Sequence, residues 1–138
     1  RTLREKWQQD GVRTFLGLHT QGFPNLFIMS GPQSGGAQFN FTRGIEGHTD
    51  YVVWMLSTIR ERGAAVVDIQ KAPEDEYAAH CREADLRTAP LRDCLSYYNG
   101  DGNAAPGSLA YYGGPETWHR IRREAQATLA PYVFEAAG

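Results

Sequence analysis

Two apolar runs near the start of the chain predict a pair of short strands. Residues 14–18 (TFLGL) and 25–30 (NLFIMS) both have strand length, and the second is continuous enough for a central strand covered on both faces. A turn is expected between them, because Gly22 supplies conformational freedom and Pro24 fixes φ. The glycines and the proline of residues 31–36 then interrupt the apolar pattern, so the second strand is expected to end in a loop.

A long amphipathic helix is predicted over residues 42–62. Apolar side chains recur there at helical spacing, namely Ile45, Val52, Met55, Leu56 and Ile59. Gly63 is the expected end of this helix, because glycine readily adopts the conformation that ends many helices. The glycine-rich loop is therefore expected to lead into a helix N-terminus.

The second half of the chain continues the alternation of strands and helices. A short strand is predicted over residues 65–69, and two helices over residues 73–86 and 115–127, each with a proline in its first turn. Residues 88–107 are irregular and rich in turn-forming residues, and so long a loop indicates a functional segment. Residues 108–112 can form one more strand. This mixture of elements indicates an α/β fold.

The composition is that of a globular protein of the cytoplasm. Hydrophobic residues make up 41% and charged residues 22% of the 138 positions, which predicts one folded domain or part of one. The formal net charge of −2 gives no basic surface for nucleic acid or for an anionic membrane. Two cysteines without zinc-site spacing favour a reducing, cytoplasmic compartment, and the longest apolar stretch, residues 51–56, is too short to span a bilayer.

The histidines do not combine with carboxylates or cysteines into a recognisable site. Glu46 and His48 lie two residues apart on the predicted helix, so they face different sides, and structural roles are expected for both. His19 is expected to be a surface or packing residue. His80 and His119 lack partners at ligand spacing, so no metal site is predicted.

The sharpest local feature is the segment SGPQSGG, residues 30–36, between a predicted strand and the long helix. A glycine-rich turn lets a ligand approach the backbone closely, and a helix N-terminus offers unpaired N–H groups. The arrangement suits a phosphate or any group that becomes negative. The glycine spacing matches neither a P-loop nor a dinucleotide-binding fingerprint. A tight turn that only packs a helix on a sheet is the alternative interpretation.

Several motifs occur in an order that is typical of one enzyme family. RTFLGL, GFPNLF and GPQS follow one another within residues 3–34, and IEGHTDYVVWML, SYYNG and YYGG come later. Together they resemble the C-terminal portion of the Baeyer–Villiger flavin monooxygenases, relatives of cyclohexanone and phenylacetone monooxygenases. The resemblance covers essentially the whole chain. It implies an α/β flavoprotein with two dinucleotide-binding domains, in which residues 1–62 end the FAD-binding domain and residues 63–138 form a C-terminal region with a control-loop-like segment at 88–107.

The resemblance also implies a function. Members of the family use FAD and NADPH to insert one oxygen of O₂ next to a ketone carbonyl, which gives an ester or a lactone. The two glycine-rich fingerprints that such an enzyme needs are absent, so these residues are expected to belong to a longer protein and to be inactive without its N-terminal portion. A flavin monooxygenase that oxidises nitrogen or sulfur, and a non-catalytic binding domain, are the alternatives.

The resemblance assigns backbone and side-chain groups to the cofactors and the substrate. The residues expected to bind FAD or NADPH are Gly31, Pro32, Asn40, Phe41 and Tyr97. The residues expected to line the ketone pocket are Ser34, Gly35, Gly36, Ala37 and Gln38. Backbone N–H groups near Asn40 and Phe41 are expected to face the electron-rich pyrimidine end of the flavin, because a helix N-terminus is a fixed donor. Tyr97 stands where the family usually has tryptophan, and Gln38 where it often has an apolar residue.

Overall fold

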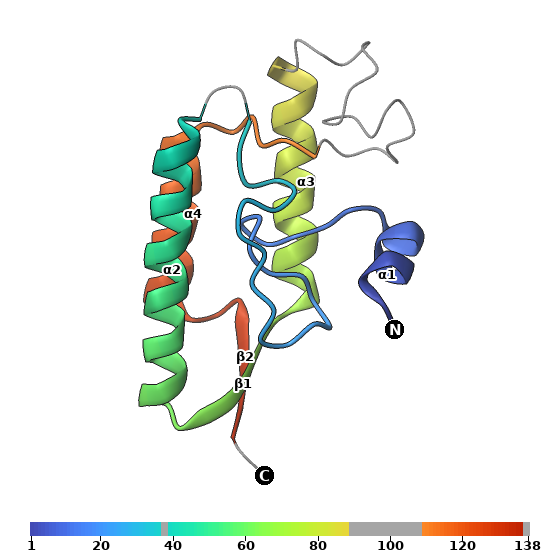
Figure 1. Cartoon of the computed structure of the whole chain (residues 1–138). Coiled ribbons are helices and arrows are strands. Elements are labelled where there is room, and N and C mark those ends of the chain that lie inside the picture. The colour runs from blue at the N-terminus through green and yellow to red at the C-terminus, as the bar shows by residue number, and fades with distance from the viewer. Residues whose placement is uncertain (37–38, 89–108, 137–138) are drawn as a thin grey trace.

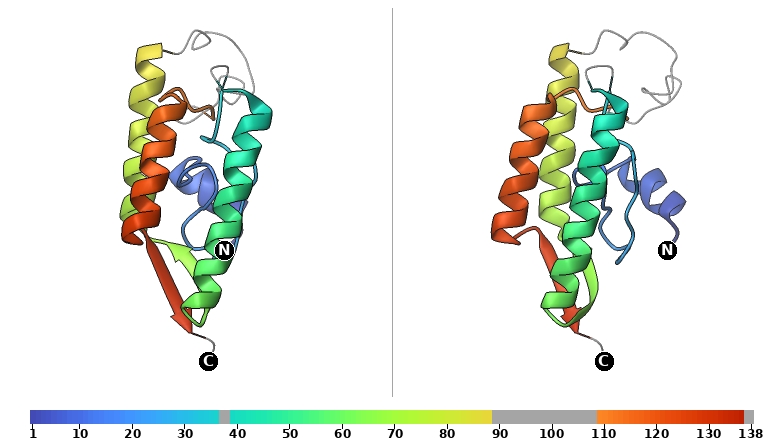
Figure 2. Two further views of the ribbon diagram at one scale, coloured as in Figure 1. Left: turned by 90° about the vertical axis from the view of Figure 1, so that its left-hand side faces the viewer. Right: turned by 60° about the vertical axis from the view of Figure 1, so that its left-hand side comes forward.

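Three long helices, one short helix and a two-stranded sheet make up the computed structural model, which describes residues 1–36, 39–88 and 109–136. In chain order the elements are α1 (Leu3–Asp10), α2 (Phe41–Glu61), β1 (Ala64–Ile69), α3 (Lys71–Thr88), α4 (Pro115–Thr128) and β2 (Tyr132–Ala136). Helices α2, α3 and α4 stand beside one another, and the irregular segment of residues 11–36 packs against them with α1 on its outer side (Figures 1 and 2). Within the described ranges, no helix has both the length and the apolar character needed to cross a membrane.

Strands β1 and β2 form an antiparallel sheet at one end of the helices (Figure 1). Val67 pairs with Phe134 in this sheet, and Ile69 pairs with Tyr132. The strand predicted over residues 65–69 is thereby confirmed, whereas β2 was not predicted. The sequence of β2 has a single buried side chain, that of Tyr132, so no apolar alternation marks it as a strand.

The helices predicted from the apolar pattern and its proline starts are confirmed. Helix α2 matches its prediction to within one residue at each end, and Gly63 follows it with a φ of +62°. Helix α3 begins two residues before Pro73, whose missing N–H is tolerated in a first turn, and α4 begins at Pro115. Helix α1 was not predicted, although Thr2 and Glu5 form a capping box at its start.

The strands predicted over residues 14–18, 25–30 and 108–112 are wrong where the structure describes them. In the first segment only Phe15 pairs, across a tight turn, with His19 as an isolated bridge. Two consecutive residues of that segment and the first and last residues of the second have positive φ, which breaks the extended backbone that a strand needs. The described part of the third segment is also irregular. Apolar side chains of the first two segments still belong to the core or pack against it, although the backbone that carries them forms turns and not a sheet.

A buried ion pair joins α1 to α3. The side chains of Lys6 and Glu74 are each 2% exposed, and Nζ of Lys6 lies 2.8 Å from both carboxylate oxygens of Glu74. The ammonium also donates to the Thr20 hydroxyl and the Gln21 carbonyl, at 2.9 and 2.8 Å. Glu74 in turn accepts from the Thr20 hydroxyl and the Gln21 N–H. Because both charges are fully hydrogen-bonded, the pair can fix α1 and this turn on the first turn of α3.

We expect removal of one charge of this pair to be costly. Glu74→Gln should lower the free energy of unfolding by about 3–5 kcal/mol, because it leaves a buried ammonium without its counter-charge. Lys6→Met added to Glu74→Gln should recover most of the loss. Urea unfolding of the three proteins measures this.

The matched control is an exposed ion pair on α4. Glu124, whose carboxylate accepts from Arg120 at 2.9 Å, is 61% exposed at its side chain. Glu124→Gln should change the free energy of unfolding by about 0.5 kcal/mol or less. A similar loss in Glu74→Gln and Glu124→Gln would contradict a structural role for the buried pair.

A chain of hydrogen bonds runs through the aromatic core. His19 is 3% exposed and packs against Phe27, Tyr51 and Tyr132. The Tyr51 hydroxyl lies 2.9 Å from Nε2 of His19 and donates to the Tyr132 hydroxyl at 2.7 Å, so Nε2 of His19 carries the hydrogen. Burial lowers the pKa of His19 to about 4. The packing role expected for His19 is confirmed, and the residue does not lie at the surface.

Burial of neutral His19 should make stability depend on pH. The pKa of His19 falls from 6.5 to about 4 on folding, so the folded state resists protonation that the unfolded state accepts. The free energy of unfolding should therefore be highest above pH 6.5 and fall as the pH drops to 4, by about 3 kcal/mol from this residue. Urea unfolding between pH 4 and 7 measures the slope.

His19→Gln is the variant that isolates this contribution, because its amide can still donate to Tyr51 and does not titrate. His48 has a similarly lowered pKa, so the variant should keep part of the slope. The explanation fails if the slope in His19→Gln equals that of the unchanged protein.

Candidate functional site

The glycine loop, residues 30–36, crosses the turn at Gly17 with no space for a side chain between them. A Cβ on Gly17 would overlap that of Ser34 and lie 2.5 Å from the Ser34 Cα, and a Cβ on Gly31 would lie 2.6 Å from the Gly17 carbonyl oxygen. Gly17 also has a φ of +71°, which favours glycine. The two backbone segments can therefore touch only because glycines stand at the crossing.

Gln33 anchors the middle of the glycine loop. Its side chain is 1% exposed, and Oε1 accepts from the N–H and the hydroxyl of Thr14, both at 3.0 Å. Its carbonyl accepts from the Tyr77 hydroxyl at 2.8 Å, and its N–H donates to the Leu109 carbonyl at 2.8 Å. These bonds hold a residue whose φ of +65° is unfavourable without support. No sequence pattern indicated this anchoring role, because a lone glutamine in a turn is ordinarily exposed.

The glycine loop leads to the N-terminus of α2, whose first two N–H groups have no acceptor among the residues that the structure describes. Asn40 caps the helix, since its side-chain oxygen accepts from the Arg43 N–H at 3.0 Å and its carbonyl from the Gly44 N–H at 2.9 Å. The N–H groups of Phe41 and Thr42 come too early in the helix to have an intrahelical acceptor. The first turn contains no acidic residue to offset the helix dipole. This helix end can therefore receive an electron-rich or negatively charged group.

A cavity of about 360 Å³, here called the loop pocket, lies between the glycine loop and the start of α2. Among the residues predicted to bind cofactor or substrate, those that line it are Gly31, Pro32, Ser34, Gly35, Gly36, Asn40 and Phe41. Ala37, Gln38 and Tyr97, the other predicted residues, lie outside the described residues. The structure thus brings the described members of both predicted groups around one cavity of a size that suits a small molecule or part of a cofactor.

A buried histidine also lines the loop pocket. His48 is 3% exposed, and its Nδ1 accepts a hydrogen bond from the Ser30 N–H at 3.2 Å. Its ring packs on Trp118, with the ring centroids 5.4 Å apart. Burial and the nearby Arg122 guanidinium lower the pKa of His48 to about 4. Glu46 is exposed, so the expectation that the Glu–His pair faces different sides is confirmed.

A smaller cavity of about 280 Å³ adjoins the loop pocket on the side of α4. It shares Ser34, Asn40 and His48 with the loop pocket, and α4 adds Trp118 and His119. The ring of His48 is therefore part of the wall of both cavities. The described residues that line the two cavities include no carboxylate, so the electrostatic environment favours acceptor groups.

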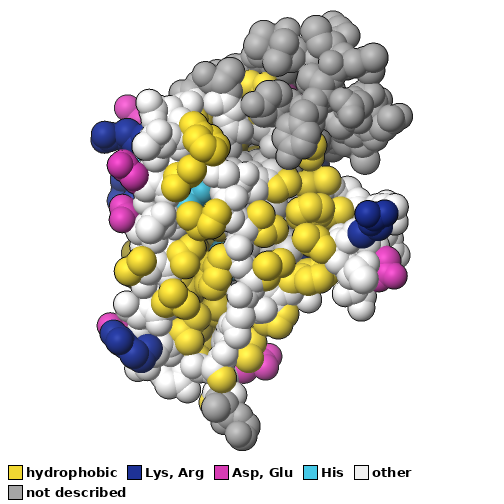
Figure 3. Space-filling view, in the orientation of Figure 1, with side chains coloured by type: hydrophobic (Ala, Val, Ile, Leu, Met, Phe, Trp, Pro, Cys, Tyr) yellow, Lys and Arg dark blue, Asp and Glu magenta, His cyan; other side chains and the backbone are white. Residues whose placement is uncertain are grey.

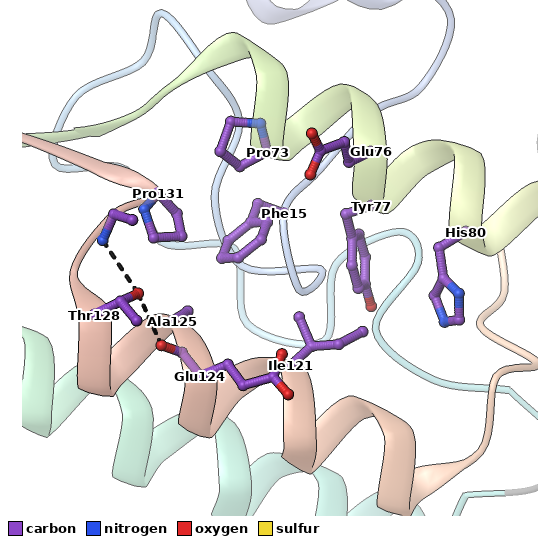
Figure 4. A pocket seen from close by; sticks show the side chains of 11 residues that line it. Phe15, Pro73, Glu76, Tyr77, His80, Ile121, Glu124, Ala125, Thr128 and Pro131 are labelled. Carbon is purple, nitrogen blue, oxygen red and sulfur yellow. Dashed lines mark hydrogen bonds between the residues drawn. The ribbon is translucent and has the colours of Figure 1, made fainter.

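A third cavity, of about 400 Å³, lies between α3 and α4, with the rings of Phe15 and Tyr77 between the two helices (Figure 4). Glu76 and Glu124 also line it, but Glu124 is paired with Arg120. None of the predicted site residues lies there. Among the described ranges, no group of three histidine, cysteine or acidic side chains is placed to hold a metal ion. The loop pocket is therefore the candidate functional site.

Sequence comparison relates the chain to larger monooxygenases. No protein-family model matches it. Baeyer–Villiger monooxygenases of Penicillium patulum and Streptomyces coelicolor are each 30% identical to it, over 91% and 88% of this chain. A phenazine N-monooxygenase of Lysobacter antibioticus is 25% identical over 98% of this chain. The chain spans only 22%, 20% and 25% of these three relatives.

The fold matches a solved monooxygenase over almost every residue. An oxidized steroid monooxygenase bound to NADP aligns with a TM-score of 0.85 and 27% identity, over 99% of this chain and 25% of that one. The chain matches the C-terminal portion of a Baeyer–Villiger monooxygenase. The α/β fold class predicted for a Baeyer–Villiger flavoprotein with two dinucleotide-binding domains is confirmed by this likeness.

The contact at Gly17 gives a test of how the glycine loop is positioned. Gly17→Ala should lower the free energy of unfolding by about 3 kcal/mol, because the new methyl group must displace Ser34 and also adopt positive φ. Gly22→Ala is the matched control: its φ is +84°, but the added methyl group would meet open space. It should cost about 1 kcal/mol. Urea unfolding compares the two, and equal losses would show that the crossing does not constrain the loop.

Proposed function

We propose that the protein containing this chain is an FAD- and NADPH-dependent Baeyer–Villiger monooxygenase. It inserts one oxygen of O₂ next to a ketone carbonyl and releases an ester or a lactone. The present residues form one wall of the flavin and ketone site, and the N-terminal portion supplies the dinucleotide-binding fingerprints. The 30% identity to two Baeyer–Villiger relatives supports this activity, and the loop pocket supports the placement of the site.

The loop pocket has the chemical character that the edge of a flavin ring requires. Gly31, Gly35 and Gly36 line this pocket with backbone alone, and Phe41, whose N–H has no acceptor among the described residues, lines it at the start of α2. No carboxylate among the described lining residues repels an electron-rich ring. FAD, when bound, supplies the activation of O₂. The chain itself orients the ring, donates N–H groups toward its pyrimidine end and narrows the space for the ketone.

The assignments that extend beyond the described residues remain predictions. In this proposal Ser34, Gly35 and Gly36 begin the ketone wall, and Ala37 and Gln38 continue it. Tyr97 would contact NADPH from the control-loop-like segment. The boundary between the FAD-binding domain and the C-terminal region, proposed after residue 62, coincides with the turn between α2 and β1. A cytoplasmic location likewise remains a prediction.

An extensive apolar surface supports packing against the rest of the proposed protein. Hydrophobic side chains gather on the face that carries α2 and the irregular segment (Figure 3). Phe41, Val53 and Leu56 of α2 are 70%, 59% and 54% exposed. Apolar area of this kind marks an interaction surface rather than a surface in water. In our proposal the N-terminal portion of the same protein covers it.

Oxidation of an aromatic nitrogen is the second candidate activity, and the likeness to a phenazine N-monooxygenase favours it. The same loop pocket would then orient the flavin, and the oxygen acceptor would be a ring nitrogen instead of a ketone. The two activities differ in product, so one set of assays separates them.

The test is made on the full-length protein. We expect it to purify with FAD, to consume NADPH when cyclohexanone is added, and to transfer one atom of isotopically labelled O₂ into the lactone, which mass spectrometry detects. The same assay with phenazine reports N-oxidation. A protein with FAD that makes only the N-oxide would establish the second activity, and one that binds no FAD would overturn both.

A further inference from the structure

We propose that His48 is a positioning residue that sets the angle between the glycine loop and α2, and through it the shape of the loop pocket. This inference rests on the proposed function, because it gives a role in the flavin site to a residue outside the predicted cofactor and substrate contacts. Its basis is the hydrogen bond from the Ser30 N–H to Nδ1 of His48 and the place of the ring in the wall of both adjoining cavities.

The Ser30 bond joins the two walls of the loop pocket. The far part of the glycine loop is held by Gln33, which bonds to Thr14, Tyr77 and Leu109, all outside α2. At the near end, the N–H of Ser30 binds a side chain of α2 itself. This bond therefore links the start of the loop to the helix whose N-cap Asn40 and first residue Phe41 line the cavity.

Ser30 needs such support because of its backbone conformation. Its φ is +52°, in the left-handed region that non-glycine residues rarely adopt. Its side chain is exposed, so it does not fix the residue by packing. The bond to buried His48 acts through the backbone and holds the chain just before Gly31, the glycine that touches the turn at Gly17.

The ring of His48 is itself held from the side of α4. Trp118 packs on it and donates from Nε1 to the Leu16 carbonyl at 3.1 Å. Arg122 donates to the carbonyl of Gly47, the neighbour of His48, at 3.1 Å. The imidazole of His48, which extends from α2, is thus held against α4 by Trp118 and Arg122.

The protonation state of His48 matches this role. Among the described residues, the ionisable side chains near the ring are Arg43 on α2 and His119 and Arg122 on α4, and none of these three is acidic. Burial and Arg122 lower the pKa of His48 to about 4, so the ring is neutral at ordinary pH. Because Nδ1 accepts from Ser30, the hydrogen lies on Nε2, which has no hydrogen-bond partner in the described parts of the chain.

Two substitutions of His48 distinguish the role of Nδ1 from that of Nε2. The amide oxygen of His48→Asn can take the place of Nδ1, whereas the amide of His48→Gln reaches the position of Nε2. We would measure, in the FAD-loaded full-length protein, the hydrogen–deuterium exchange of a peptide covering residues 28–34, together with kcat and KM for cyclohexanone.

We expect His48→Asn to exchange at the wild-type rate and His48→Gln to exchange about tenfold faster at Ser30, the factor of a single lost hydrogen bond. KM should rise in His48→Gln and be restored in His48→Asn. Glu46→Gln, on an exposed position of the same helix turn, is the control and should leave the exchange unchanged.

Each other result overturns the proposal. Rescue by His48→Gln instead of His48→Asn would show that Nε2 is the functional atom. Unchanged exchange in both variants would show that the Ser30 bond does not hold the loop, and faster exchange in both would show that the whole imidazole is needed for packing. The exchange measurement needs no turnover, so a wild-type protein without oxygenase activity would overturn the proposed function and still report on His48.

Discussion

The closeness of two backbone segments is the constraint on which the candidate site depends. The turn at Gly17 and the glycine loop meet where a Cβ on either Gly17 or Gly31 would collide with the other segment. Direct contact between these two backbone segments restricts the position of the loop more than side-chain packing would. Side chains can change rotamer to relieve a close contact, whereas planar peptide groups cannot. The loop in turn determines where one wall of the pocket lies, and α2 provides the other wall.

Hydrogen bonds to buried polar side chains stabilise the irregular segment, where the hydrogen bonds of a sheet are missing. Residues 11–36 contain no strand, so their polar groups need other partners. Gln33 and the Lys6–Glu74 pair supply several of them, from inside the segment and from the helices on either side. Such partners are specific in position, which explains how a segment without regular structure can present backbone N–H groups and glycines at a defined place.

The sequence predicted the parts of the fold that rest on local rules. The 3.6-residue periodicity of α2 and the proline starts of α3 and α4 depend on neighbouring residues only, and these helices are confirmed. The strands over 14–18 and 25–30 were wrong because an apolar run reports burial and not backbone conformation. Lys6 and Glu74 are 68 residues apart, so no local pattern could reveal their pairing. The described loop residues chosen by resemblance do share one pocket, but Gln33 and His48 needed the three-dimensional contacts to be seen.

The central claim is that the amide groups at the start of α2 face the electron-rich end of a flavin. A crystal structure of the full-length protein with FAD tests it most directly. We expect a flavin pyrimidine oxygen or nitrogen about 3 Å from the backbone nitrogen of Phe41 or of an adjacent residue. A flavin bound elsewhere, with this helix end facing solvent, would contradict it.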